Sequence, residues 1–292
     1  MTETVHIGPY FVAIIDIVGQ RDKLKAWASP PNNKAELERL ASDVIETAGY
    51  VKELRSQFDQ LYAAAKQPTG LLDHLDPEKR AWVEGRKQTN LWRRGFSDSY
   101  VMTVPCWYEQ AWGLHAADIY YSLLGICGLF IWSLAMEKPF RGGVDVGLGI
   151  EIDTQEVYGP VTVQAYELES RKAKCPRIMV GEGLLSYLDD LEQKCASDPD
   201  GRHTRLNIQN SRGLITRPRG GKPMLDVMGN GVHSVLNHEL FGQMVEAGYS
   251  FVVREQKRFY QSGPKKLYHR YSQLREYCES RLQVWGVNPV QE

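Results

Sequence analysis

Residues 10–17 read YFVAIIDI, a continuous apolar run that ends near a single acid, and Gly19 follows shortly after. An apolar run of this length without alternation is typical of a strand that is covered on both faces. Apolar residues from Leu37 to Phe58 then recur every three or four positions, which predicts a long helix within residues 34–66. The chain is therefore expected to begin with a buried strand followed by a long helix.

Strand and helix patterns continue to alternate along the chain. Residues 67–88 hold two Pro, two Gly and mixed charges, and they predict a surface insertion. Two β-prone runs predict a hairpin with Asp98 near its tip. The other predicted elements are, in order, the hairpin strands 91–97 and 99–104, a helix over 108–136, a strand over 141–152, a helix over 160–173, a strand over 177–180, a helix over 182–195, strand-like pieces around 206–216, 222–228 and 249–260, and a helix near 265–284.

This order of elements predicts an α/β (α+β) fold, in which helices flank one mixed or antiparallel sheet. Residues 1–195 are expected to form the core of the domain. Residues 196–292 are expected to complete the same domain with strands and a helix, and not to form an independent unit.

The composition limits the classes of protein. The chain has 292 residues, with 35 Lys and Arg against 36 Asp and Glu, and 42% of its residues are hydrophobic. These values exclude a disordered chain and are typical of a soluble globular protein. The near-zero net charge argues against nucleic acid as the main partner, although a local basic pocket stays open. Five Cys without a CxxC pair, and no signal peptide before them, predict reduced thiols in a cytoplasmic protein.

Residues 119–136 carry no formal charge over 18 positions, which is the minimum length of a membrane-spanning helix. The stretch contains Tyr, Ser and Gly, and no basic cluster flanks it. We therefore favour a buried core helix over a membrane span.

Asp16 and Asp98 form the most informative pair of polar residues. The first acid closes an apolar strand and the second lies in the predicted hairpin, so a neighbouring strand pair would bring the two carboxylates together. Two carboxylates with no obvious basic neighbours repel each other and are expected to share hard divalent cations, Mg²⁺ or Mn²⁺, as in phosphoryl-transfer sites. The alternative is that each Asp caps a turn.

Four segments resemble, in this order, the class III nucleotidyl cyclase family: FVAIIDIVGQ (11–20), RRGFSDSYVMTV (93–104), RGGVDVGLG (141–149) and VYGPVTVQAYELES (157–170). The resemblance implies a ferredoxin-like core and a homodimer whose active sites lie at the interface. It also implies an enzyme that uses two metal ions. In such an enzyme the 3′-hydroxyl of a nucleoside triphosphate attacks its own α-phosphate, giving a cyclic monophosphate and pyrophosphate.

The resemblance assigns roles to particular residues. Asp16 and Asp98 match the two metal-binding Asp of the family, and the backbone carbonyl of Ile17 is an added metal ligand. Val18, Gly19 and Gln20 lie in the turn whose amides face the triphosphate. Arg217 or Arg219 would contact phosphate, with Arg21 and Lys23 as alternatives, although such a charged segment is also typical of a solvated loop.

The sequence departs from the purine cyclases of the family. The two positions that select the base hold Arg94 and Glu156. The helix that carries a transition-state Asn and Arg in the family reads Val163 and Glu167, and the nearest basic side chain is Arg171. Adenylate or guanylate cyclase activity is therefore poorly supported.

The VYGPV-x-x-x-AYELE turn and helix, with a C-terminal Tyr-x-x-Leu-Arg-x-Tyr run at 271–277, resemble the bacterial pyrimidine cyclases of antiphage defence. This resemblance implies cyclic UMP or cyclic CMP as a second messenger that acts on a separate cyclic-nucleotide-gated effector. Arg94 could donate to the carbonyl edge of uracil, and the alternative is that it is a solvated charge on a strand. Tyr50 could stack on a small base, and the alternative is that it is a helix packing residue. We favour UTP over CTP as the substrate.

No HExxH, Cys/His zinc spacing, GxGxxG, P-loop or GxSxG motif occurs in the sequence. Two hypotheses remain. One is a metal-dependent homodimeric pyrimidine cyclase, with no nucleic-acid partner and no membrane span. The other is a cyclase-fold binding or regulatory protein that has lost catalysis, which Val163 and Glu167 motivate.

Overall fold

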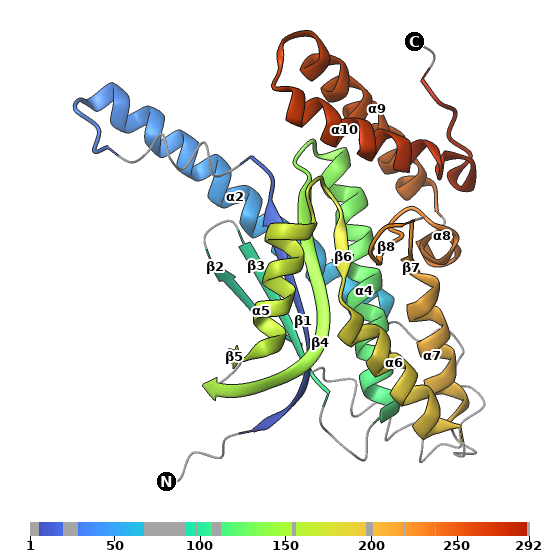
Figure 1. The fold of residues 1–292 in the computed structure, drawn as a ribbon. Helices are drawn as coiled ribbons and strands as arrows, with labels where there is room; N and C mark the ends of the chain where they lie inside the picture. The colour runs from blue at the N-terminus through green and yellow to red at the C-terminus, as the bar shows by residue number, and fades with distance from the viewer. Residues whose placement is uncertain are drawn as a thin grey trace.

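The computed structural model describes residues 6–19, 29–66, 91–96, 99–106, 112–153, 156–196, 201–218, 220–236 and 238–290. The predicted insertion at 67–88, together with Asp98, Gln20, Arg21, Lys23 and Arg219, lies outside the described residues. The described elements are β1 (Ile7–Ile17), α2 (Lys34–Ala65), β2 (Trp92–Phe96), β3 (Ser99–Pro105), α4 (Trp112–Ala135), β4 (Phe140–Asp153), β5 (Glu156–Tyr158), α5 (Pro160–Glu167), the π-helix η2 (Leu168–Lys172), β6 (Ile178–Val180), α6 (Glu182–Cys195), α7 (Arg202–Gly213), β7 (Ile215–Thr216), β8 (Met224–Leu225), α8 (Asn230–Leu236), α9 (Glu239–Ser262), α10 (Lys265–Glu279) and the 3₁₀ helix η3 (Leu282–Trp285) (Figure 1).

The strands form one mixed sheet, in the order β2-β3-β1-β4-β6-β8-β7, with β5 paired to the outer part of β4. β1 lies between β3 and β4 and runs antiparallel to both. β4 and β6 are parallel, and the remaining described pairs are antiparallel. The predicted α/β class, with one sheet flanked by helices, is therefore confirmed.

β1 is buried on both faces, as its unbroken apolar sequence predicts. Its odd-numbered residues from Phe11 to Ile17 pack into the large core with α2 and α4. Its even-numbered residues from Tyr10 to Ile14 pack against Val161 and Ala165 of α5. The two packing layers fix the register of the central strand, because a slip of one residue would exchange its two faces.

α4 is the innermost helix of the core, and α2, α7 and α9 pack around it. A Cβ atom added to Gly125 would lie 3.1 Å from the ring of Phe58, so this glycine permits the close approach of α2. Within the described part of the chain, His115–Ala135 is one helical segment long and apolar enough to cross a membrane, and 89% of its most apolar window is buried inside the protein.

β4 carries glycines where α5 and η2 cross it. A Cβ atom added to Gly143 would lie 2.3 Å from the carbonyl oxygen of Ala165 and 2.8 Å from the amide nitrogen of Glu169. A side chain at this position would therefore hold the helical segment away from the strand. The run RGGVDVGLG thus provides a surface on which backbone packs against backbone.

The C-terminal part differs from its prediction, because helices replace most of the expected strands. Residues 206–213 belong to α7 and residues 249–260 belong to α9, while β7 and β8 have two residues each. The run YSFVV within α9 reads as a strand by itself. Over the whole helix, however, Phe241, Val245, Tyr249 and Val252 recur at helical spacing and are buried.

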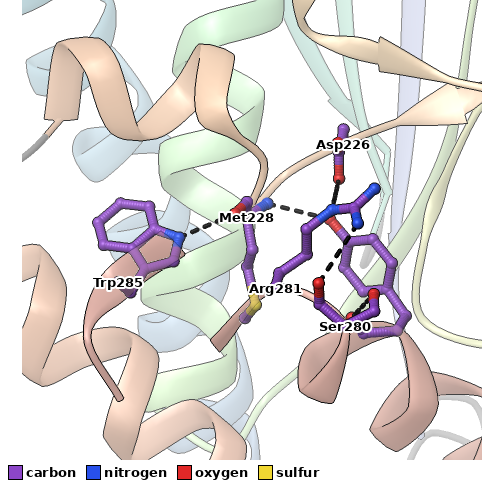
Figure 2. A network of polar contacts seen from close by, with 6 residues as sticks. Asp226, Met228, Ser280, Arg281 and Trp285 are labelled. Atoms are coloured by element: carbon purple, nitrogen blue, oxygen red, sulfur yellow. Dashed lines mark hydrogen bonds and ion pairs between the residues drawn. The ribbon is translucent and has the colours of Figure 1, made fainter. Parts of the chain in front are cut away.

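A polar network connects the C-terminal helices to the sheet (Figure 2). The hydroxyl of Tyr277 donates to Oδ1 of Asp226 at 3.0 Å and accepts from the amide of Met228 at 3.0 Å. Arg281 donates to the same carboxylate oxygen at 2.8 Å, and the indole of Trp285 donates to the carbonyl of Met228 at 2.9 Å. The network therefore joins the C-terminal helices to the segment that follows β8, and residues on both sides of position 195 contribute to the same large core.

Candidate functional site

Asp16 lies at the end of β1, at the edge of the sheet. Its register partners are Ser99 on β3 and Arg141 on β4. Residues directly opposite each other in an antiparallel pair point to the same face, so the three side chains lie together on the α5 side of the sheet. The side chain of Asp16 is 23% exposed, which leaves one part of the carboxylate open to solvent.

Arg141 is the ion-pair partner of Asp16. Its Nη2 donates to Oδ2 of Asp16 at 3.1 Å, and its Nε lies 2.7 Å from Oε1 of Glu169. The expectation that the acid at the end of the first strand has no basic neighbour is therefore wrong. The reason is the register of β4, which places the first residue of RGGVDVGLG opposite Asp16.

Glu169 reaches this cluster from η2. The predicted helix over 160–173 ends its α-helical part at Glu167 and continues as a π-helix. The side chain of Glu169 is only 5% exposed and faces Arg141. π-Helical turns occur frequently at functional sites, where the extra residue changes the direction of a side chain.

The cluster of Asp16, Arg141 and Glu169 carries two carboxylates for one guanidinium. Its formal charge is therefore −1 when all three groups are ionised. The hydroxyl of Ser99 lies beside the cluster, 3.5 Å from Oδ1 of Asp16. Such a cluster retains attraction for a cation, with Asp16 as its more accessible carboxylate. The described residues do not by themselves form a group of three or more metal-ligating side chains.

The other predicted metal and phosphate contacts are only partly described. Asp98 lies outside the described residues. The amide of Val18 donates to the carbonyl of Pro139, next to β4, and the amide of Cys106, next to β3, donates to the carbonyl of Pro9. The backbone groups of alternate residues of β1 therefore face β4 and β3 in turn, which directs the carbonyl of Ile17 towards β3. Gly19 follows with φ of +94°, a conformation that favours glycine.

The amide of Val18 is not available for a triphosphate, because it donates to the carbonyl of Pro139 at 3.0 Å. The expectation that the turn offers its amides to phosphate is therefore wrong at this position. Gly19 remains the exposed residue of the described part of this turn.

Arg94 and Glu156, the two positions associated with base selection, are in contact with each other. Nη1 of Arg94 lies 2.5 Å from Oε2 of Glu156, and both side chains are about half exposed. Arg94 is opposite Val101, which is opposite Ile14, so it lies on the same face as Asp16. Arg94 is therefore displaced from Asp16 by two residues along the strands and by two strands across the sheet, which corresponds to a separation of about 12 Å.

Tyr50 does not belong to this site. It is 3% exposed in the core on the other face of β1, where its ring stacks on Trp132 with centroids 5.8 Å apart. Its hydroxyl donates to the carbonyl of Lys138 at 2.8 Å, and burial raises its pKa. Of the two interpretations of Tyr50, these contacts favour the helix packing residue over the residue that stacks on a base, because the helical stripe that carries Tyr50 packs against α4.

Arg217 is also remote from Asp16 within the chain. It follows β7, four strand spacings or about 19 Å across the sheet from β1. There it forms an ion pair of 3.0 Å with the exposed Glu182. The expected phosphate contact is thus not made by this residue in the same chain.

The helix that carries the transition-state residues in the resembled family has an acid at one of those positions. Val163 is largely exposed, and Glu167 forms an ion pair of 2.8 Å with Arg171. The nearest basic side chain is therefore held by the acid that precedes it by one turn. No known protein-family model matches the sequence, and no curated protein matches it either.

Proposed function

We propose that this protein is a metal-dependent pyrimidine nucleotide cyclase, which converts UTP or CTP to the cyclic monophosphate and pyrophosphate. The observation that carries the proposal is the position of Asp16. The acid ends the central strand on the same face as the Arg94–Glu156 pair, so one ligand with a phosphate chain and a base could contact both.

The arrangement of the first elements supports a ferredoxin-like cyclase core. β1, α2, β2, β3, α4 and β4 follow one another as strand, helix, two strands, helix and strand. Their strand order is β4-β1-β3-β2, with antiparallel neighbours, and both helices pack on the same face. This order agrees with the one expected for a ferredoxin-like split βαβ unit and so supports the proposal.

In the proposed reaction the chain binds and orients the triphosphate. Divalent metal ions, held by Asp16, the carbonyl of Ile17 and Asp98, would neutralise the phosphates and lower the pKa of the attacking 3′-hydroxyl. Arg141 lies beside Asp16 and offers a guanidinium to the phosphate chain, while the buried Glu169 fixes its position. Glu169 is thus a positioning residue in this proposal.

The Arg94–Glu156 pair supports a small base over a purine. Two long side chains that meet across this face of the sheet reduce the room that is left for a base. A guanidinium is a planar group that carries only N–H donors, and this chemistry matches the carbonyl edge of uracil.

An exposed apolar surface supports the homodimer. Ile7 is opposite Ile150, which is opposite Tyr158, so these side chains share one face at the outer end of β1, β4 and β5. We call this surface, with Leu148 and Ile152, the sheet-end patch. All of its members except Ile150 are more than half exposed. A contiguous apolar patch of this kind marks an interaction surface, and a second copy of the chain is the proposed occupant.

A second candidate function is a regulatory protein that binds a nucleotide without turnover. The Glu167–Arg171 ion pair favours it, because the basic side chain closest to the expected transition-state position already has a partner. The Arg141–Asp16 ion pair is a further competitor for metal at the first strand.

The decisive experiment incubates the purified protein with Mn²⁺ and each of the four nucleoside triphosphates, and identifies products by mass spectrometry. We expect cyclic UMP or cyclic CMP from the wild type and none from Asp16→Ala. The exposed Asp190 of α6 provides a matched control, and Asp190→Ala should retain turnover. Absence of cyclic product from UTP and CTP, together with nucleotide binding, would instead support the regulatory protein.

The homodimer is tested separately by size-exclusion chromatography with light scattering. Leu148→Asp places a charge in the sheet-end patch and should convert a dimer to a monomer with the same circular dichroism spectrum. Val235 of α8 is an exposed apolar residue elsewhere, so Val235→Asp should leave the dimer intact. A wild type that is monomeric at high concentration would reject this part of the proposal.

A further inference from the structure

Basic residues are concentrated in one short segment of the chain. Residues 256–275 contain six Lys and Arg and no Asp or Glu, while the rest of the chain has 29 Lys and Arg against 36 Asp and Glu. The near-zero net charge therefore averages an acidic body with one basic segment. A separation of charge of this kind indicates an electrostatic interaction surface.

The basic segment forms the end of a helical hairpin. α9 and α10 pack against each other, are joined through Gly263 and Pro264, and extend beyond the sheet at the top of Figure 1. Contacts between the helices hold the hairpin together: Gln256 donates to Ser272 at 3.0 Å and accepts from Arg275 at 2.9 Å. The side chains at the hairpin end are thus mounted on a rigid support.

Two aromatic rings lie among the cations at this end. Tyr260 of α9 is 75% exposed, and its ring centroid is 5.5 Å from that of Tyr268 of α10. Lys257 precedes Tyr260 by three residues and Lys265 precedes Tyr268 by three residues, so each Lys lies on the same helix face as its Tyr. We call Lys257, Tyr260, Lys265, Lys266 and Tyr268 the hairpin-end cluster.

The lysines of the cluster are available for an external partner. Arg258 and Arg275 form ion pairs with Glu255 and Glu279, respectively. By contrast, Lys257, Lys265 and Lys266 are exposed and form no ion pair with the described residues of the chain. Within the described part of the chain, the charge of these three lysines is thus not neutralised by an ion pair.

We propose that the hairpin-end cluster binds single-stranded nucleic acid. Unpaired bases would stack on Tyr260 and Tyr268, and phosphates would contact the three lysines, which is the combination of aromatic platform and cationic rim that single strands require. An anionic membrane fits less well, because insertion needs an apolar wedge, whereas the exposed ring of Tyr260 carries a hydroxyl and Tyr268 is half-buried. The proposal concerns a surface separate from Asp16 and does not depend on catalysis.

Fluorescence anisotropy of a labelled oligothymidine of about 20 nucleotides, titrated with the full chain at about 50 mM salt, tests the proposal. Tyr260→Ala should weaken binding by about 5- to 100-fold through the loss of stacking, while Tyr260→Phe should bind as the wild type. Replacement of Lys257, Lys265 and Lys266 by Ala should reduce the slope of log K against log salt by about 2.

A second triple variant controls for net charge. Lys34 and Lys52 are exposed on α2 and Lys174 is exposed between η2 and β6, and their replacement by Ala changes the net charge equally. We expect this variant to bind the oligonucleotide nearly as the wild type. The proposal is overturned if the wild type does not bind, if both triple variants lose the same affinity, or if the chain binds duplex as tightly as single strands. Binding to phosphatidylserine vesicles without binding to the oligonucleotide would assign the cluster to membranes and reject nucleic acid.

Discussion

Replacement of Gly143 by Ala tests the packing that forms the candidate site. The added methyl group would lie 2.3 Å from the carbonyl oxygen of Ala165, 2.5 Å from Cβ of Leu168 and 2.8 Å from the amide nitrogen of Glu169. Ordinary contacts begin near 3.4 Å, so the helical segment has to move by about 1 Å away from β4. Two of the three atoms belong to backbone, so a rotamer change of one side chain does not relieve the overlap.

The cost of this overlap follows from the packing of cores. Insertion of an extra methyl group into a close-packed interface typically costs about 1 to 3 kcal/mol. The displaced segment includes Glu169, whose carboxylate lies 2.7 Å from Arg141, so the ion-pair cluster at Asp16 is disturbed as well. A displacement of about 1 Å at a catalytic group can reduce turnover by about 100-fold.

Urea unfolding followed by circular dichroism measures the stability of Gly143→Ala, and the turnover assay with UTP and CTP measures its effect on the site. Gly49 provides the matched control, because it is exposed within α2 and an added Cβ atom meets no atom within 4 Å. Gly49→Ala should raise the free energy of unfolding by about 0.5 to 1 kcal/mol through helix propensity. A Gly143→Ala protein as stable as Gly49→Ala would refute the close packing of α5 and η2 on β4.

Two further predictions concern stability. Tyr277→Phe removes the hydroxyl that bonds to the amide of Met228 and to the carboxylate of Asp226, so it should lower the free energy of unfolding, measured in urea, by about 1 to 3 kcal/mol. The control Tyr260→Phe changes an exposed residue and should alter the free energy of unfolding by less than about 0.5 kcal/mol. Equal effects of the two substitutions would contradict the network in Figure 2. Burial lowers the pKa of His115 from 6.5 to about 4, so the unfolded chain binds more protons than the folded chain between these pH values. As the pH falls from 6.5 to 4, the free energy of unfolding of the wild type should therefore decrease by up to about 3 kcal/mol relative to that of His115→Gln. Asp118, whose pKa burial raises to about 6, has the opposite effect in both proteins, so the difference between the two unfolding curves isolates His115, and parallel curves would contradict its burial as a neutral ring.

The predicted elements agree with the structure where one local pattern decides the outcome. The apolar run at 10–17 lies within β1, and the helical spacing at 34–66 ends within one residue of α2. The first half of the chain has such patterns in nearly every element. By contrast, α9 contains a short run with the appearance of a strand, and only its full length of 24 residues shows the helical period.

The candidate site was predictable only in part, because its residues come together through register. Asp16 was identified from the sequence, since it ends a buried strand. Arg141 and Glu169 were missed, because their approach to Asp16 depends on the alignment of β4 with β1 and on the π-helical turn of η2. A charged first residue on a glycine-rich strand was the one available signal for Arg141.

The interior position of α4 has a consequence for the synthesis of the protein. α4 ends at Ala135, whereas α9, which packs on it, ends at Ser262. At about 5 to 20 residues per second, a ribosome adds the intervening 127 residues in about 6 to 25 s. During that interval a helix with the length and apolarity of a membrane span lacks the cover of α9, so part of its apolar surface stays accessible until α9 has been synthesised.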